Sequence, residues 1–365
     1  MSNTQTYLLQ TMTHLLYLAQ HSLRKARVFR DRTQPLDSLD DDELIARYRL
    51  PRTCIMELCD ELTDELTRPT ARSSALSVPT QVLTALRFFA TGSMQRVTGD
   101  LHGISQASTS RCVNAVASAL CRLAPRYIKF PADEASQRQI VGDFYKIAGF
   151  PNVVGCVDGT QIAITSPSVN EHVYMCRKGY HSLNVQGICD ARLQFINVVA
   201  KYPGSAHDSF VWRNCAVYHF MEQEEADPNA NQRWILGDSA YPLSPFTMTP
   251  VTNANTAAEL RYNKKHAQTR NTVERAFGLL KMRFRCLHKT GGCLQSPPQG
   301  CAKVISACTV LHNICIQNAV PAPADEFEDD DGSQRPTETV VDDHSVNLRN
   351  GARIRKNLID RRFNN

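Results

Sequence analysis

The stretch NVVGCVDGTQ, residues 152–161, decides the fold of this chain. Residues 153–157 are apolar with no alternation of polarity, which is typical of a strand covered on both faces. The run ends on one carboxylate, Asp158, followed by Gly159 and Thr160. Ligands of open α/β sheets bind outside the carboxyl ends of strands, so an acid there is rigidly held and available for chemistry. An Asp that only caps a turn gives the same local pattern.

Two further acids follow the same logic. The run WILGDSAY, residues 234–241, places Asp238 at the end of a second apolar strand. Glu274 lies in NTVERAFGLLKMRF, residues 271–284, at the edge of a helical stripe of apolar residues. That stripe consists of Val273, Phe277, Leu280 and Phe284. Glu274 can therefore face the strand ends while its helix stays packed.

Three carboxylates without a paired His or Cys favour the hard cations Mg²⁺ or Mn²⁺ over zinc. Two such ions can activate the attacking oxygen and stabilise the leaving oxygen of a phosphoryl displacement. The charge around Glu274 fits a phosphate substrate, since residues 259–289 hold nine Lys or Arg and two acids. This imbalance indicates a polyanionic partner.

The net charge of +5 hides a segregation along the chain. Residues 325–343 hold nine acids and one Arg, whereas residues 349–362 hold six bases and one acid. The remaining body is basic, which favours nucleic acid as a partner. The thirteen cysteines are scattered singly, as expected of reduced thiols in a cytosolic or nuclear protein. We expect neither a signal peptide nor a membrane span.

The N-terminal third is predicted to be helical. Residues 1–35 combine an apolar helical pattern with a basic run, which suits either a docked amphipathic helix or a DNA-contacting arm. Helices at 82–90, 94–101 and 106–123, with a turn at 102–105, resemble a helix-turn-helix, although any three-helix bundle gives this pattern. Ser105 can cap the third helix. Its predicted DNA contacts are Gln106, Ser108, Thr109 and Arg111.

The later chain is predicted as a linking helix at 133–148, short strands at 162–165, 183–189 and 195–201, and a helix from 205 to 212. The order of strands and helices indicates a mixed α/β domain. Asp208 is interpreted as a helix cap or a further site residue. His312, with Cys308 and Cys315, could form a zinc site, but a hydrogen bond under the active site fits better.

We predict four segments in the chain. These are an N-terminal helix and basic arm at 1–35, a helical domain with the helix-turn-helix at 36–132, a catalytic domain at 133–320, and a disordered tail at 321–365, acidic and then basic.

Several motifs, in this order, resemble one known family. They are PRTCIMELCDEL (51–62), RPTARSSALSVPTQVL (68–83), GISQASTSRCV (103–113), VGCVDGTQIAI (154–164), RKGYHSLNVQGICD (177–190), YPGSAHDS (202–209), LGDSAYP (236–242), RNTVERAFGLLKMRFRCL (270–287) and VLHN (310–313). The strand-Asp, strand-Asp, helix-Glu order is similar to the RNase H-like domain of DDE transposases and integrases. The closer resemblance, over residues 36–318, is to the PIF/Harbinger transposases and their derived nucleases.

The resemblance implies an RNase H-like DDE catalytic domain with Asp158, Asp238 and Glu274 as catalytic and metal-binding triad. It implies Mg²⁺ or Mn²⁺, two ions in all, a nuclear location after synthesis in the cytoplasm, DNA ends and target DNA as partners, a homodimer or higher oligomer on DNA, and a separate Myb/SANT-like partner protein. Water would cleave the phosphodiester to expose a 3′-hydroxyl, which then attacks target DNA. Backbone contacts are expected from Arg177, Lys178, Arg270, Arg275, Lys281, Arg283 and Arg285.

Two other functions fit parts of the sequence. VDGT followed by GDS also resembles aspartate-based phosphatases, but the residue at the nucleophile position is Cys156. A domesticated nuclease or DNA-binding protein could keep the fold without transposition. The intact triad favours an enzyme.

Overall fold

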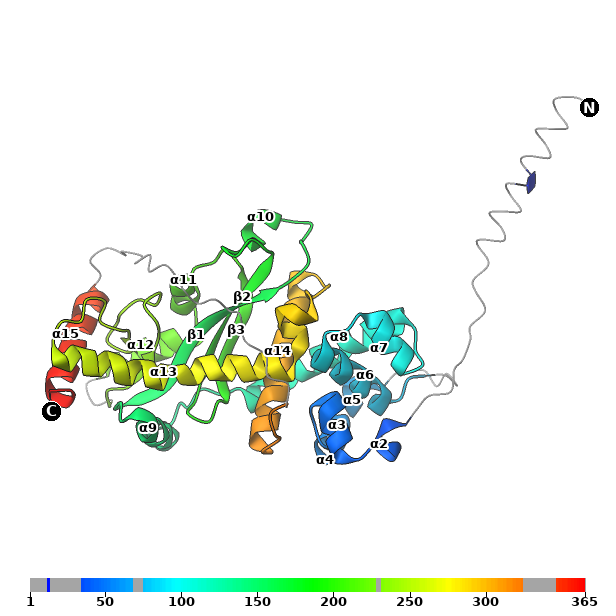
Figure 1. Cartoon of the computed structure of the whole chain (residues 1–365), viewed down its shortest axis with the longest axis horizontal. Coiled ribbons are helices and arrows are strands. Elements are labelled where there is room, and N and C mark those ends of the chain that lie inside the picture. Colours follow the sequence, from blue (N-terminus) through cyan, green and yellow to red (C-terminus); the bar gives the residue numbers. More distant parts are fainter. Residues whose placement is uncertain (1–11, 14–33, 68–74, 228–230, 324–345, 365) are drawn as a thin grey trace, which may run out of the picture. The chain divides into compact units, whose positions relative to one another are not determined.

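The apolar runs around the three acids form one mixed β-sheet. The computed structural model describes residues 12–13, 34–67, 75–227, 231–323 and 346–364 (Figure 1). Residues 34–365 form one compact unit, and residues 1–33 form a separate unit in which Met12 and Thr13 are helical. Residues 1–11 and 14–33 of the predicted N-terminal arm, 1–35, lie outside the described residues. No helix of the described part combines the length and apolar character needed to cross a membrane.

The sheet contains β1 (Val153–Ala163), β2 (Ser182–Cys189), β3 (Phe195–Pro203), β4 (Trp234–Leu236) and β5 (Thr247–Met248). Its strand order is β3-β2-β1-β4-β5. The central strand β1 is antiparallel to β2 and parallel to β4, and β5 is parallel to β4. This arrangement confirms the predicted mixed α/β class.

One expectation about β1 is wrong. The sequence suggested that the strand stops at Asp158 and that a separate strand covers 162–165, whereas β1 continues unbroken to Ala163. The polar residues Asp158 to Gln161 stay in the strand because they pair with β2, from Asp158↔Gly187 to Gln161↔Asn184. Backbone pairing with a neighbouring strand holds this segment extended without an apolar pattern.

The two faces of the sheet are covered by different helices. On one face, Cys156, Leu236 and Phe195 join a core with residues of α13 (Ala257–Arg283) and α14 (Pro298–Gln317). On the other face, residues including Val157 and Ile235 pack with Trp212 and Met221 of α11 (Asp208–Arg213) and α12 (Ala216–Ala226). After a register shift between Val153 and Gly155, the side chains of β1 alternate between these two cores from Cys156 onward.

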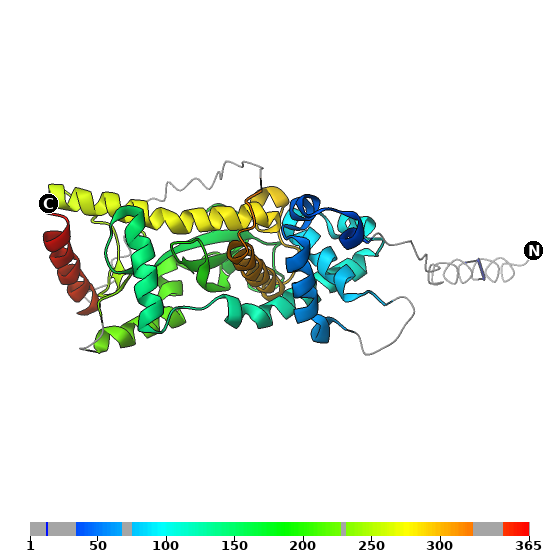
Figure 2. The same ribbon diagram turned by 90° about the horizontal axis from the view of Figure 1, so that it is seen from below.

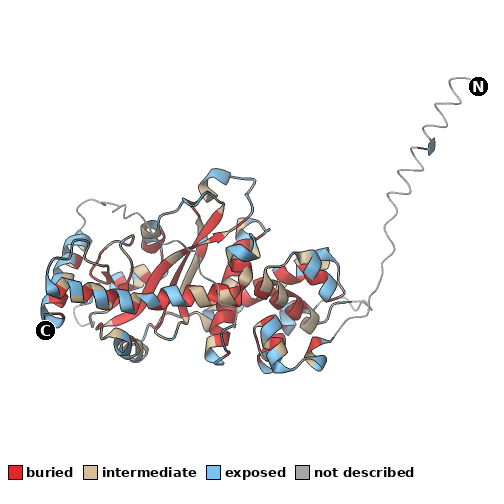
Figure 3. Ribbon diagram, viewed as in Figure 1, coloured by how far each residue is buried: buried red, intermediate tan, exposed pale blue. Residues whose placement is uncertain are grey.

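Helix α13 positions the third acid. A capping box between Thr256 and Glu259 fixes its start. It passes in front of the sheet in Figure 1, and buried and exposed residues alternate along it in Figure 3. The predicted stripe of Val273, Phe277 and Leu280 is buried, with Phe284 just beyond the helix end. The helical period therefore predicted the packed face of α13 correctly.

The helices expected in the N-terminal third are present. Helices α6 (Val78–Thr91), α7 (Gln95–Leu101) and α8 (Gln106–Tyr127) match the three predicted segments. The side chain of Ser105 caps α8, as predicted, by accepting a hydrogen bond from the Ser108 amide at 3.2 Å. The remaining elements are α2 (Pro35–Ser38), α3 (Asp41–Tyr48), α4 (Arg52–Glu61), α5 (Thr63–Leu66), α9 (Glu134–Ala148), α10 (Glu171–Tyr174), η1 (Arg285–Leu287) and η2 (Lys289–Gly291).

The C-terminal basic segment differs from the expected disordered tail. Residues Val346–Arg362 form α15, which lies beside the beginning of α13 in Figures 1 and 2. The buried ring of Phe363 contacts Phe150 and Tyr262, with ring centroids 5.5 Å apart in each pair. Arg355 donates to the carbonyl oxygens of Thr249 and Pro250, both at 3.0 Å. These few anchors order a segment whose composition is mostly polar.

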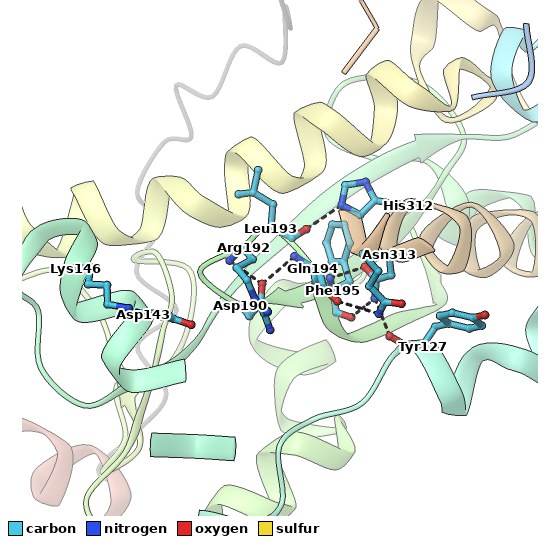
Figure 4. Close-up of polar contacts among 11 residues, drawn as sticks. Tyr127, Asp143, Lys146, Asp190, Arg192, Leu193, Gln194, Phe195, His312 and Asn313 are labelled. Carbon is cyan, nitrogen blue, oxygen red and sulfur yellow. Dashed lines mark hydrogen bonds and ion pairs between the residues drawn. The ribbon is translucent and has the colours of Figure 1, made fainter. Parts of the chain in front are cut away.

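The motif VLHN at 310–313 holds α14 against the β2–β3 hairpin. Nε2 of His312 donates to the Leu193 carbonyl at 2.8 Å (Figure 4). The Asn313 side chain accepts from the Phe195 amide at 2.9 Å and donates to the carbonyls of Phe195 and Tyr127 at 2.7 and 2.9 Å. Buried polar side chains need such partners, so these two residues serve the packing of α14.

Candidate active site

Asp158 lies in the middle of β1 with its side chain mostly buried. The parallel pairing of β1 with β4 ends at Cys156↔Leu236, so Asp158 is the second residue beyond the last pair. Its Oδ1 accepts a hydrogen bond from the Gly159 amide at 2.9 Å. Asp158 shares its sheet face with Cys156, because side chains two residues apart in a strand point the same way. That face is the one covered by α13.

Asp238 has the matching position on the neighbouring strand. It is the second residue beyond Leu236, the Cα partner of Cys156. Leu236 belongs to the core on the α13 face and Ile235 to the opposite core, and Asp238 follows two residues beyond the end of β4. Adjacent strands are about 4.8 Å apart. Oδ1 of Asp238 accepts from the Ala240 amide at 2.9 Å, which closes the turn after β4.

Glu274 is brought to the same face by the packing of α13. The Cys156 thiol donates to the Thr269 carbonyl at 3.5 Å, which fixes this turn of α13 beside β1. One turn beyond Glu274, Phe277 packs over Gly187, the β2 residue paired with Asp158. The Glu274 side chain is 46% exposed. The helix is thus fixed to the sheet on both sides of Glu274, while the carboxylate itself is partly exposed.

Arg270 connects two of the three acids. Its Nη1 lies 3.6 Å from Oδ2 of Asp158, and its Nη2 contacts Oε1 of Glu274 one turn along the helix. The motif analysis assigned Arg270 to DNA and missed this role. The i,i+4 spacing of Arg270 and Glu274 was a signal that could have indicated the pair.

Within the part of the chain that the structure describes, no three His, Cys, Asp or Glu side chains lie close enough together to hold one ion. The donor set still fits a hard divalent cation, because all three groups are carboxylates. A guanidinium already lies between Asp158 and Glu274, so a positive group occupies the position where their negative charges converge. The chemistry of the site therefore suits a cation.

The residues predicted to contact DNA in the catalytic domain differ in solvent exposure. Arg177, Lys178 and Arg275 are exposed, and Arg285 is half-buried with its Nη2 3.3 Å from the Thr290 hydroxyl. Lys281 and Arg283 are buried. Nη2 of Arg283 donates to the Val320 carbonyl at 2.7 Å, and Nη1 lies 3.5 Å from the His312 carbonyl. The predicted DNA contacts of Lys281 and Arg283 are therefore wrong, because both side chains point into the protein.

The predicted contacts at the start of α8 divide in the same way. Gln106 and Arg111 are exposed and Ser108 is half-buried, so these three stay as predictions. Thr109 is fully buried, and its hydroxyl donates to the Ser105 carbonyl at 3.2 Å. A methyl group on Gly99 of α7 would lie 2.8 Å from that hydroxyl. Thr109 thus packs α8 against α7, which contradicts its predicted contact with DNA.

Asp208 lies on the opposite face of the sheet from the three acids. His207 occupies the N-cap position of α11, and Asp208 is its first residue. Oδ1 of Asp208 accepts a hydrogen bond from the side-chain Nδ2 of Asn184 at 2.9 Å. The same oxygen lies where a side chain on Gly159 would project. Gly159 follows Asp158 and so points to the other side of β1. Asp208 therefore supports β1 from behind, and its predicted cap position is wrong by one residue.

The structure argues against two alternative sites, the zinc site and the phosphatase nucleophile. The Cys308 thiol lies 3.8 Å from Sγ of Cys286, and the Cys315 thiol donates to the Arg49 carbonyl at 3.4 Å. Among the described residues, no three His, Cys, Asp or Glu side chains form a group that could hold a zinc ion. His312 already donates to the Leu193 carbonyl. Burial raises the pKa of Cys156, whose thiol is directed at α13. A buried neutral thiol is a poor nucleophile, so the phosphatase hypothesis has no attacking group there.

Comparison with known proteins shows the family to which the chain belongs. A family described as DDE superfamily endonuclease matches residues 157–313. The five-stranded mixed sheet is consistent with the fold of this class of DDE endonucleases. The proteins named "Putative nuclease HARBI1" of Homo sapiens and Bos taurus are 41% and 42% identical over 285 residues, covering 78% of this chain and 80% of each relative. The chain belongs to this family of Harbinger transposase-derived DDE nucleases.

A more distant relative comes from plants. "Protein ALP1-like" of Arabidopsis thaliana is 27% identical over 254 residues, which covers 66% of this chain and 61% of that protein. No solved structure matches the chain.

Proposed function

We propose that this chain is a metal-dependent DNA nuclease with an RNase H-like DDE site, which hydrolyses a phosphodiester and exposes a 3′-hydroxyl. The observation that carries the proposal is that Asp158 and Asp238 are each the second residue beyond Cys156↔Leu236, the last pair of the parallel strands β1 and β4, while α13, which packs on this sheet, bears Glu274. Two acids with matched register and a third from a crossing helix can converge on one phosphate. The membership in a DDE endonuclease family supports the same reaction class.

Asp158, Asp238 and Glu274 would hold Mg²⁺ or Mn²⁺, with two ions as the expected number. When bound, the metal supplies a polarised phosphate and an activated water. The chain itself supplies two fixed carboxylates, oriented by the amides of Gly159 and Ala240, and one adjustable carboxylate on α13. Water attacks phosphorus and the 3′ oxygen leaves with the electron pair and gains a proton. No protein side chain becomes covalently attached, in keeping with the buried state of Cys156.

The exposed cations would position the DNA backbone. Arg177 and Lys178 lie in the loop before β2, and Arg275 follows Glu274 on α13. Gln106, Ser108 and Arg111 at the start of α8 are suited to phosphate or base-edge contacts of a helix-turn-helix. Phosphate contacts of this kind release counterions, so binding is expected to weaken steeply with salt.

The biological setting follows as part of the same proposal. We expect the chain to act on transposon terminal repeats and target DNA in the nucleus, after synthesis in the cytoplasm. We also expect it to assemble as a homodimer or higher oligomer on DNA, alongside a Myb/SANT-like partner protein. A transposase would join the exposed 3′-hydroxyl to target DNA, whereas a domesticated nuclease would stop after cleavage. The basic surface of the catalytic domain supports a nucleic-acid substrate in either case.

The test is Mn²⁺-dependent nicking of duplex DNA that carries terminal inverted repeats, compared with a scrambled duplex. We expect Asp158→Asn, Asp238→Asn and Glu274→Gln each to reduce the nicking rate by at least about 100-fold, the upper end of losses seen for groups that only support metal ligands. The control is Glu222→Gln, which removes an exposed acid from α12 on the other side of the sheet.

The products decide between the two versions of the function. A nick that a polymerase can extend carries the 3′-hydroxyl, and joining of that end to a target plasmid identifies a transposase. Cleavage without joining identifies a nuclease. Equal nicking by the wild type, the three triad variants and Glu222→Gln would refute the assignment of the acids.

A further inference from the structure

Arg270 contacts two of the three acids of the candidate active site. Its guanidinium contacts Asp158 of β1 with Nη1 and Glu274 of α13 with Nη2, so one positive group spans two of the three acids. The Arg270 side chain is 19% exposed and that of Asp158 11%, so solvent screens this pair only partly. An arginine fork is well suited to two carboxylates at once.

The packing of α13 explains why the guanidinium stays there. The Cys156 thiol donates to the carbonyl of Thr269, the residue before Arg270. This contact holds the backbone of Arg270 beside β1. Cys156, which makes the contact, is two residues before Asp158. Glu274 lies one turn further along the same helix, where i,i+4 neighbours face each other. The fold therefore delivers a cation to the place where the two acids would otherwise repel one another.

A divalent ion held by Asp158 and Glu274 would use the carboxylate oxygens that Arg270 contacts. Asp158 and Glu274 cannot give the same oxygens to a guanidinium and to a metal ion, so the two cations compete. Glu274 contacts Arg270, and the three acids do not form a group that could hold an ion in the described structure. Release of Arg270 would free Glu274 to turn toward the strand ends.

We propose that Arg270 is a built-in counter-cation that closes the metal site until a divalent ion displaces it. This proposal rests on the proposed function of Asp158, Asp238 and Glu274 as metal ligands. Arg270 here is a positioning residue, because it acts through the two carboxylates. Once displaced, its guanidinium is near the metal site and available to a DNA phosphate, which would tie ion loading to substrate binding.

The experiment measures Mn²⁺ binding to the full chain without DNA, by calorimetry and by the spin resonance signal of free Mn²⁺. Arg270→Gln should bind Mn²⁺ at least about tenfold more tightly than the wild type if the Arg270 pair is closed in nine of ten molecules, since apparent affinity scales with the open fraction. Arg270→Lys should show a smaller gain, because a single ammonium lacks the fork. It also serves as the second variant if Arg270→Gln does not fold.

Two controls separate this effect from a general change in charge. Lys264→Gln removes one exposed positive charge from the same helix and should leave Mn²⁺ affinity at the wild-type value. Arg270→Gln combined with Asp158→Asn should lose the gain, because the ion then lacks a ligand from β1. Thermal unfolding without metal checks that each variant is folded.

The outcomes distinguish this proposal from the function on which it rests. If the wild type binds Mn²⁺ and Arg270→Gln binds it equally or more weakly, the counter-cation role is overturned while the metal site stands. If neither the wild type nor the folded Arg270 variants bind Mn²⁺, the metal-dependent nuclease itself is overturned. A gain that survives the loss of Asp158 would place the ion elsewhere and overturn the role of Arg270.

Discussion

Arginines of one helix take three different roles within a few turns. Arg270 bridges two acids, Arg275 faces solvent, and Arg283 enters the core at the end of α13. What differs is the partner that each side chain meets. Arg283 reaches the His312 carbonyl in the last third of α14 and the Val320 carbonyl just beyond the helix. Its burial lowers its pKa, so the hydrogen bonds to these oxygens are needed to keep the charge inside.

We expect Arg283→Ala to reduce the free energy of unfolding by about 2–4 kcal/mol, because it leaves buried carbonyls without donors and opens a cavity. Arg275→Ala should change it by less than about 0.5 kcal/mol, as is usual for surface positions. Urea unfolding followed by tryptophan fluorescence measures both. A stable Arg283→Ala protein with reduced DNA affinity would restore the original prediction that this side chain contacts DNA.

At the scale of elements, the contact between α13 and the sheet controls the site. Gly187 of β2 lies opposite Asp158, and a methyl group there would come within 2.7 Å of Phe195 and 2.8 Å of Phe277. Glycine thus allows the helix to approach the sheet one turn from Glu274. A shift of α13 would move Glu274 relative to Asp158, so packing and chemistry are coupled at this residue.

The prediction at this scale concerns two glycines. Gly187→Ala should destabilise the protein by about 1–3 kcal/mol through overpacking, and it should lower the nicking rate as well. Gly142→Ala on α9 has open space around it and should stabilise the protein by up to about 1 kcal/mol, because alanine favours the helix. Thermal and urea midpoints give the comparison. Equal midpoints for the two variants would show that α13 does not need this close approach.

The elements show what the sequence could predict and where it could not. Strands β2 and β3 were expected almost at their observed bounds, because their apolar runs are bounded by turn residues. The acids could be found because they follow such runs. The extension of β1 beyond Asp158 depends on pairing with β2, and α15 depends on a few anchors such as Phe363. Contacts between distant segments create these features, and no local pattern encodes them.

Arg270 and Arg283 illustrate the same limit within the site. Both looked like phosphate ligands, because the sequence shows a basic cluster and not the partners of each member. Spacing indicated the Arg270–Glu274 pair, but the contact with Asp158 arises only when α13 crosses β1.

At the scale of the whole molecule, buried histidines link stability to pH. Burial lowers the pKa of His102 and His266 to about 4 and that of His312 to about 3. Nearby Arg side chains lower these pKa values further, while hydrogen bonds to carbonyls raise those of His266 and His312. The three residues lie in the helical third, α13 and α14, so the effect is spread over the compact unit.

We expect stability to fall in acid. In the unfolded chain these histidines regain an ordinary pKa of 6.5, so below that pH the unfolded state binds protons that the folded state does not. Stability is intact above pH 6.5 and is lost as the pH falls toward 4 and 3, at up to about 1.4 kcal/mol per pH unit for each histidine. Urea midpoints at pH 7.5, 6.5 and 5.5 measure the slope. His312→Gln keeps an N–H donor but cannot titrate in this range, so an unchanged slope in that variant would contradict the account.

One cysteine provides a position for chemical labelling near the candidate active site. All thirteen belong to the described part of the chain, and Cys293 is the one that is exposed, next to Leu294, whose amide donates to the Ala163 carbonyl at the end of β1. A thiol-reactive fluorophore added to the unaltered protein would attach first at Cys293. It would sit near the end of β1, roughly 17 Å along the strand from Asp158, remote enough to leave the carboxylates untouched. Labelling without any substitution could therefore report on nucleic acid arriving at the nearby strand end.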